Sequence, residues 1–285
     1  MHNPDLMLLD GLRVVTTALN LPGPAACARL RDMGATISKV EPPAGDPLEG
    51  FNPAWYRELH EGMTIGRLDL KSDEGRRAMA GLLETADLLV TAQRASALER
   101  MGLGAEQLAR RYPRLCHVAI TGHASPADEL AGHDLTYLAA HGLVVPPSMP
   151  RTLYADMAGA ERAVSIALAL VMARDRTGQP QRATAAIADA AAALAQPLHQ
   201  GLTRPGAVLG GGNPAYNLYA ARAGWIAVAA LEPHFEKKLG DKFALGKLTI
   251  DALRALFSSH DAEYWEEWGR RNDIPIVAVR EASES

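Results

Sequence analysis

The sequence predicts an α/β protein with a parallel sheet and a second, smaller domain. In the first half of the chain, short β-branched runs alternate with helical patterns, and Gly and Pro residues separate them. A chain of 285 residues is also long enough to bury one large core and one smaller core. Parallel strands joined by crossover helices follow from these two observations.

The elements of the large domain are expected in alternating order. Strands are predicted at residues 12–16, 36–40, 64–68, 88–91 and 115–120, and helices at 25–33, 72–85 and 105–111. Ser72 is a suitable cap for the second helix because acidic residues follow it. A Pro-rich connector then leads to a long helix over about 156–175 and a further helix over 188–196.

The pattern changes near residue 205. A glycine run precedes two strand-like segments at 216–220 and 225–229, which predict a hairpin, and helices are expected at 233–239, 250–258 and 262–271. The sequence therefore predicts a large α/β domain over residues 1–204 and a small α+β domain over 205–285.

Composition argues against several classes of protein. With 29 Lys and Arg against 33 Asp and Glu, the net charge of −4 disfavours nucleic acid as a partner. The two cysteines, Cys27 and Cys116, show no metal or disulfide spacing, so we expect no metal site and a reducing, cytoplasmic location. The first residues do not resemble a secretion signal, and the longest apolar stretch, 163–173, is too short to span a membrane.

Candidate chemical groups are carboxylates and a histidine. Glycine fingerprints for dinucleotides and phosphates are missing, and so is a serine nucleophile motif. His133 and Asp134 stand beside Gly132 at one predicted helix start, and Asp156 stands at another. Asp134 and Asp156 could simply cap helices. His133 and Asp156 are 23 positions apart, so only the tertiary fold can bring them together.

Ordered motifs over nearly all of the chain resemble the class III CoA-transferase family. They are 9–15 (LDGLRVV), 23–24 (GP), 30–35 (LRDMGA), 39–47 (KVEPPAGDP), 68–71 (LDLK), 98–104 (LERMGLG), 158–159 (AG), 176–179 (RTGQ) and 225–228 (WIAV). Three further segments, 132–134 (GHD), 210–212 (GGG) and 230–235 (ALEPHF), resemble the α-methylacyl-CoA racemase branch.

The resemblance implies a Rossmann-like large domain, an interlocked homodimer, and coenzyme A as part of the substrate rather than a separate cofactor. In such a racemase, one group removes the α-proton of a 2-methylacyl thioester and a second group returns a proton to the opposite face. His133 and Asp156 match the family's two acid/base residues. Backbone N–H groups at the start of the helix near Asp156 are candidate donors to the enolate oxygen.

The resemblance also implies roles for five other residues. Asp134 and Glu232 match acidic residues near the histidine, where a carboxylate would orient the imidazole. Arg94, Lys39 and Gly132 match positions that bind CoA. Other histidines, including His60, show no partner and are expected to be structural or surface residues.

Two alternatives remain open at this stage. In a CoA-transferase, Asp156 would be a nucleophile that forms an enzyme-bound CoA thioester. In a non-catalytic member, the fold would only bind an acyl-CoA or a partner. Residues 273–279 match a family segment after which the chain normally returns to the large domain, so we expect the closing elements of that domain to be missing.

Overall fold

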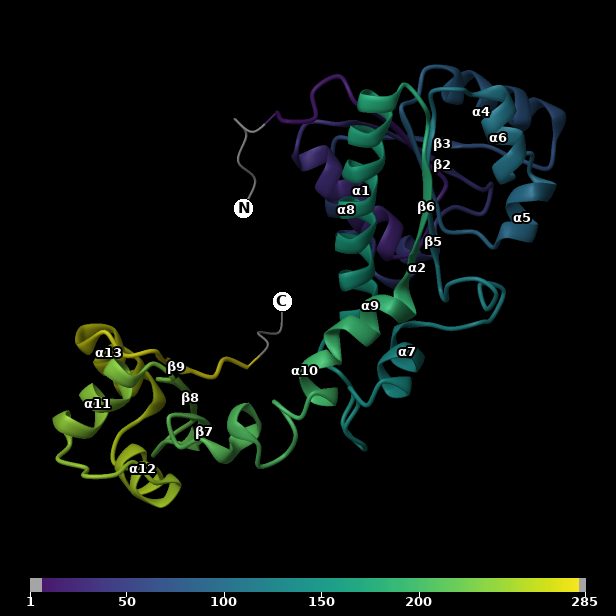
Figure 1. Ribbon diagram of the computed structural model, residues 1–285. Coiled ribbons are helices and arrows are strands. Elements are labelled where there is room, and N and C mark those ends of the chain that lie inside the picture. Colours follow the sequence, from purple (N-terminus) through teal and green to yellow (C-terminus); the bar gives the residue numbers. More distant parts are fainter. Residues whose placement is uncertain (1–6, 282–285) are drawn as a thin grey trace. The chain divides into compact units, whose positions relative to one another are not determined.

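The large sheet is parallel and doubly wound. In the computed structural model, which describes residues 7–281, its strands are β1 (Arg13–Thr16), β2 (Thr36–Glu41), β3 (Thr64–Arg67), β4 (Leu88–Thr91), β5 (Cys116–Thr121) and β6 (Arg182–Ala186). They pair in the order β3-β2-β1-β4-β5-β6 (Figure 1). This is the strand order of the Rossmann fold, and its switch point lies between β1 and β4. The predicted fold class is confirmed.

Helices cover both faces of this sheet. They are α1 (Pro22–Asp32), α2 (Pro47–Phe51), α3 (Pro53–His60), α4 (Asp73–Glu84), α5 (Ala95–Arg100), α6 (Ala105–Arg111), α7 (Asp134–Ala140), α8 (Tyr154–Thr177) and α9 (Ile187–Leu194). Helices α1 and α8 pack on one face, and α4, α5 and α6 lie on the other (Figure 1). None of the helices in the described range has the length and apolarity needed to cross a membrane.

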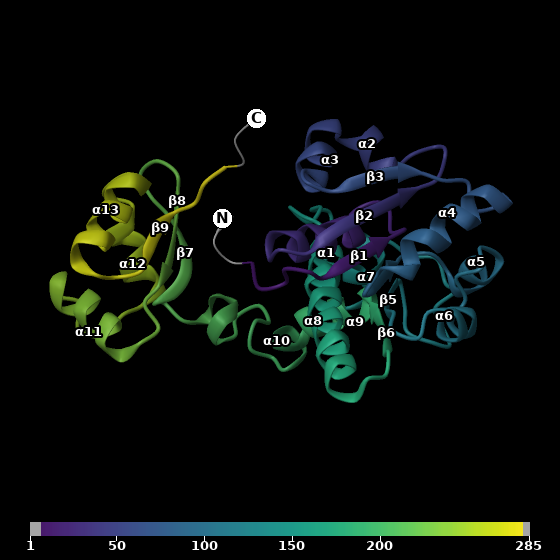
Figure 2. The ribbon, with the colours of Figure 1, turned by 90° about the horizontal axis from the view of Figure 1, so that it is seen from above.

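Strand β4 shows why the buried strands read as continuous apolar runs. Successive side chains of a strand point to opposite faces. Leu88 and Val90 therefore belong to the core under α1 and α8, whereas Leu89 belongs to the core under α4 to α6. Because both faces of the sheet are covered, apolar and polar residues do not alternate along β4. In contrast, all four residues of the edge strand β3 are exposed, and Figure 2 shows β3 beside β2 and β1.

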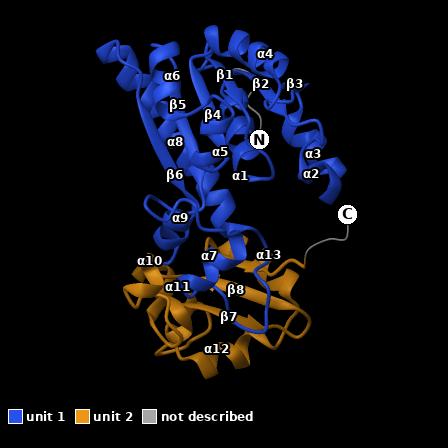
Figure 3. Ribbon diagram, turned by 90° about the vertical axis from the view of Figure 1, so that its right-hand side faces the viewer, with its two compact units in different colours: residues 1–195 blue, residues 196–285 orange. Residues whose placement is uncertain are grey.

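The second unit has its own small antiparallel sheet. The chain divides between Ala195 and Gln196 (Figure 3), whereas the sequence placed the boundary near residue 205. Its elements are α10 (Gln196–His199), the π-helical turn η1 (Val208–Gly212), β7 (Tyr216–Ala220), β8 (Trp225–Ala229), α11 (Pro233–Lys242), α12 (Ile250–Phe257), α13 (Ala262–Asn272) and β9 (Ile276–Ala278). The predicted hairpin is β7 and β8, and β9 adds a third strand beside β8.

Candidate active site

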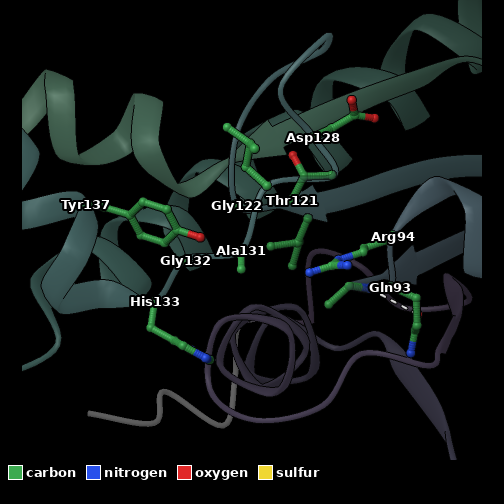
Figure 4. Close-up of a pocket in the computed structure, with 12 residues that line it drawn as sticks. Gln93, Arg94, Thr121, Gly122, Asp128, Ala131, Gly132, His133 and Tyr137 are labelled. Atoms are coloured by element: carbon green, nitrogen blue, oxygen red, sulfur yellow. Dashed lines mark hydrogen bonds between the residues drawn. The ribbon is translucent and has the colours of Figure 1, made fainter.

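A pocket opens at the carboxyl ends of β4 and β5. Its volume is about 240 Å³. Residues 92–94 follow β4 and residues 120–122 lie at the end of β5. The loop before α7 adds Asp128 and residues 130–133, and α7 itself adds Tyr137 (Figure 4). Ligands of open parallel sheets bind outside the carboxyl ends of the strands, so the pocket lies where the fold favours a site. Of the predicted site residues, Arg94, Gly132 and His133 line it.

His133 occupies the position just before α7. Its backbone is extended, with φ −142° and ψ 167°, and its side chain makes no capping hydrogen bond. Thr136 holds this residue by its backbone instead: the His133 N–H donates to Thr136 Oγ1 at 3.0 Å, and the Thr136 hydroxyl donates to the His133 carbonyl at 2.8 Å. The imidazole is therefore exposed at the pocket wall and does not cap the N-terminus of α7.

Asp134 joins α7 to the first turn of α8. The side chain is buried, and its Oδ1 accepts hydrogen bonds from the N–H of Ala155 at 2.7 Å and from the N–H of Asp156 at 3.0 Å. Among the described residues, no hydrogen bond joins this carboxylate to the His133 imidazole. Capping, the alternative interpretation from the sequence, describes Asp134 correctly, although the helix it caps is α8.

The same contacts correct the prediction for the donors to the enolate oxygen. The N–H groups of Ala155 and Asp156 donate to Asp134, and the N–H of Met157 donates to the Leu153 carbonyl at 3.0 Å. These three N–H groups are thus already paired within the protein, and they do not supply a donor to the substrate.

Asp156 is half-buried in the first turn of α8. The pKa of its carboxyl is raised from 3.8 to about 6, mainly by burial and also by the negative charge of Asp134, whereas His133 acts in the opposite direction. The fold has therefore brought His133 close enough to Asp156 to affect its charge, despite their separation in the sequence. Asp134 links the two residues, because it follows His133 directly and bonds to the backbone of Asp156.

Tyr137 is a pocket residue that the sequence reasoning passed over. It is buried, and its ring lies against Gly132 and Gly122 (Figure 4). Its position four residues after His133 on a helix is a signal that could have found it, because such residues share one helix face.

Arg94 is exposed at the rim of the pocket. It stands at the start of α5 beside Gln93, whose side chain donates to the Thr17 carbonyl at 2.6 Å and accepts from the Thr17 hydroxyl at 2.8 Å. These bonds fix the loop after β4 to the loop after β1, across the switch point of the sheet. The guanidinium of Arg94 at this position can bind a phosphate group of a ligand.

Lys39 does not lie in the pocket, contrary to the role that the resemblance implied. It is 1% exposed, and its ammonium bonds to Asp46, to Glu41 Oε1 at 3.1 Å and to His60 Nε2 at 2.6 Å. An ammonium only donates, so His60 Nε2 accepts and its Nδ1 donates to the Tyr56 carbonyl at 2.6 Å. A cation enclosed in this way has no donor left for a CoA phosphate.

The Lys39 cluster also contains a group with metal-ligand spacing. Within residues 7–281, Glu41, Asp46 and His60 place one ligand atom each within 4.8 Å of the others. Lys39 already bonds to all three side chains. The cation of this cluster is therefore the lysine.

Glu232 lies in the second unit, at the residue before α11. It is exposed, and its side chain makes no capping hydrogen bond. Its approach to His133 stays a prediction.

The parallel sheet has the strand order of a Rossmann fold, and a pocket lined by His133 lies at its carboxyl edge, so the protein belongs to the doubly wound α/β class. The family model for CoA-transferase family III matches residues 9–285. The chain therefore belongs to CoA-transferase family III.

Relatives in this family include both transferases and racemases. The cinnamoyl-CoA:phenyllactate CoA-transferase of Clostridium sporogenes is 34% identical over 202 residues, which are 63% of this chain and 49% of the relative. The α-methylacyl-CoA racemase of Homo sapiens is 32% identical over 253 residues, which are 82% of this chain and 64% of the relative. The chain thus spans about half to two thirds of the length of these curated relatives.

Solved structures show the same fold. The crystal structure of a hypothetical protein (Rv3272) from Mycobacterium tuberculosis superimposes with a TM-score of 0.83 at 24% sequence identity, covering 96% of this chain and 84% of that one. A CaiB/BaiF family protein from Brucella suis gives a TM-score of 0.78 at 22% identity, covering 96% and 84%.

Proposed function

We propose that the protein inverts the α-carbon of a 2-methylacyl-CoA thioester by two-base proton transfer. The observation that carries the proposal is that Asp156, whose pKa is raised to about 6, lies close enough to His133 of the pocket wall for the two charges to interact. An imidazole in water titrates near 6.5, so the environment of Asp156 brings a carboxyl close to the range of a histidine. A carboxyl with a pKa near 6 can act as a base in one direction of the reaction and as an acid in the other near neutral pH.

The proposed reaction balances with protons alone. For one enantiomer, the Asp156 carboxylate takes the α-proton, the electrons of the C–H bond form the thioester enolate, and protonated His133 delivers a proton to the opposite face. For the other enantiomer, neutral His133 takes the proton and the Asp156 carboxylic acid returns one. No electrons pass to another centre, so the step requires no redox cofactor, and coenzyme A enters only as part of the substrate.

A CoA-transferase is the second candidate, and the 34% identity to a cinnamoyl-CoA:phenyllactate CoA-transferase favours it. Here the Asp156 carboxylate would attack the thioester carbonyl and expel CoA thiolate, which leaves a mixed anhydride. The thiolate would then attack the aspartyl carbonyl of the anhydride, releasing the free acid and leaving CoA as a thioester on Asp156. A second carboxylic acid would take the CoA by the reverse steps.

Proton NMR of a short 2-methylacyl-CoA in heavy water tests the first candidate. We expect the wild-type protein to replace the α-proton with deuterium without any second acid, and His133→Ala to lose at least about 100-fold of this rate because a positioned acid or base contributes that much. His260→Ala, which removes a histidine of the second unit that stacks on Tyr264, should keep the wild-type rate.

The other outcomes identify the alternatives. CoA exchange between an acyl-CoA and a free carboxylate, with hydroxylamine modifying Asp156, would establish the transferase and reject the racemase. Binding of the thioester with neither reaction would leave a non-catalytic member. Unchanged deuterium exchange in His133→Ala would reject the assignment of His133.

A further inference from the structure

The ring of Tyr137 is fixed between two glycines. A Cβ on Gly132 would lie 2.6 Å from the phenol hydroxyl, and a Cβ on Gly122 would overlap the same oxygen. Both contacts would be closer than a Cβ atom ever makes, so neither glycine can be replaced by a larger residue while the Tyr137 ring keeps its place. The two glycines come from different segments, the end of β5 and the loop before α7, and together they determine where the hydroxyl lies.

The hydroxyl is available to a ligand. In Figure 4 it points away from α7 toward Gly122 and Ala131 along the pocket. No protein group within the described part of the chain accepts its proton. Burial raises the pKa of the phenol, and the charge of Asp156 acts in the same direction, so the group stays protonated and able to donate at neutral pH.

Tyr137 also has a fixed relation to His133. It lies one helical turn after His133 on α7, and its N–H donates to the His133 carbonyl at 3.2 Å. The acid/base group and the hydroxyl are therefore presented to the same pocket by one short helix. A thioester with its α-carbon near His133 would have its carbonyl oxygen two bonds away from that carbon.

We propose that the Tyr137 hydroxyl donates a hydrogen bond to the carbonyl oxygen of the bound acyl thioester. This inference rests on the proposed function, since removing the α-proton moves negative charge onto that oxygen and a donor fixed there stabilises the enolate. The N–H groups of residues 155–157 in the first turn of α8 do not supply this bond because Asp134 and Leu153 already accept from them.

Two CoA compounds and two variants test the contact. Tyr137→Phe removes only the hydroxyl, and Tyr112→Phe is the matched control, a buried tyrosine outside the pocket. Binding is measured by calorimetry for a 2-methylacyl-CoA thioester and for the corresponding thioether, which lacks the carbonyl oxygen. We expect Tyr137→Phe to weaken thioester binding about 3- to 10-fold, as the loss of one neutral hydrogen bond does, and to leave thioether binding unchanged.

Rates supply a second measurement. Deuterium exchange by Tyr137→Phe should fall by about 100-fold or more, because removing one donor to a developing oxyanion costs that much, whereas Tyr112→Phe should keep the wild-type rate. Gly132→Ala, which displaces the ring, should show the same preference for losing the thioester over the thioether.

Two results would overturn the inference. Equal losses for thioester and thioether in Tyr137→Phe would mean that the phenol shapes the pocket without touching the oxygen. No loss for either would place the donor elsewhere, for example on the free N–H groups at the start of α7. If the wild-type protein bound the thioester without exchanging its α-proton, the proposed function would fail while a thioester-specific loss would still establish the contact.

Discussion

A single carboxylate, that of Asp134, affects both the backbone and the charge of the candidate site. Its two hydrogen bonds hold the start of α8, and its negative charge is one cause of the raised pKa of Asp156. Because the folded protein binds a proton on Asp156 up to about pH 6 and the unfolded chain only to about pH 4, Asp156 lowers the free energy of unfolding as pH rises through that window. Keeping the Asp156 carboxyl at this position therefore lowers the free energy of unfolding at neutral pH.

Asp134→Asn and Asp134→Ala separate these two effects. Asn keeps an oxygen acceptor but no charge, so we expect the pKa of Asp156 to fall and the acid limb of the exchange rate to move to lower pH. Ala leaves two N–H groups without a partner, and the free energy of unfolding in urea should fall by about 1–2 kcal/mol at pH 7. Ser72→Ala removes a comparable cap from α4 and should cost about 1 kcal/mol without changing the pH profile. An unmoved acid limb in Asp134→Asn would show that Asp134 does not affect Asp156.

At the scale of elements, the Lys39 cluster connects β2 with α2 and α3. Asp46 caps α2 by accepting from the Leu48 N–H at 2.9 Å, and its other oxygen meets the Lys39 ammonium. His60, at the end of α3, completes the cluster. Burial lowers the pKa of His60, so the unfolded chain takes up a proton first and the free energy of unfolding falls as pH drops below about 6.5.

Lys39→Met tests whether the cluster is structural. The variant leaves the buried carboxylates of Glu41 and Asp46 without their cation, and we expect the free energy of unfolding to fall by about 3–5 kcal/mol at pH 7. Lys71→Met, at an exposed position of the same unit, should change it by less than about 0.5 kcal/mol. If instead the Lys39→Met variant kept the wild-type free energy of unfolding but bound CoA more weakly, Lys39 would bind a CoA phosphate, as the resemblance implied.

At the scale of the whole molecule, each unit has a separate hydrophobic core. In the second unit, Trp265 is 1% exposed, donates to the Phe257 carbonyl at 2.8 Å and meets the rings of Phe243 and Trp268. None of the residues of this core belongs to the clusters on either face of the large sheet. The interlocked homodimer stays a prediction.

Trp265→Ala should weaken the second unit alone. Removing a buried indole costs about 3–5 kcal/mol, and hydrogen exchange followed by mass spectrometry should show faster exchange in peptides after residue 196 and unchanged exchange before it. Trp225→Ala, which removes an indole that is 55% exposed, should have little effect on either unit. Faster exchange throughout residues 7–195 would show that the two units unfold together.

The sequence by itself determined the parallel sheet, most of its strands and the family. The run at 88–91 predicts a buried strand because apolar β-branched and leucine residues need covering on both faces, and β4 has those bounds. The sequence did not predict strand β6 because RATAA contains no run of large apolar or β-branched side chains. Its pairing with β5 is what makes it a strand. The sequence could predict that Gly132 and His133 lie together, because residues adjacent in the sequence are adjacent in any fold.

Only the tertiary structure decided which charged groups are enclosed and which face the pocket. The resemblance assigns both Lys39 and Arg94 to CoA binding, yet Lys39 is enclosed among carboxylates and Arg94 lies at the pocket rim. The proximity of His133 and Asp156, the bonds of Asp134 to α8, and the two glycines that hold Tyr137 all join residues distant in the chain. Burial and charge act through space, so the pKa of Asp156 and the availability of each donor depend on contacts that sequence spacing does not contain.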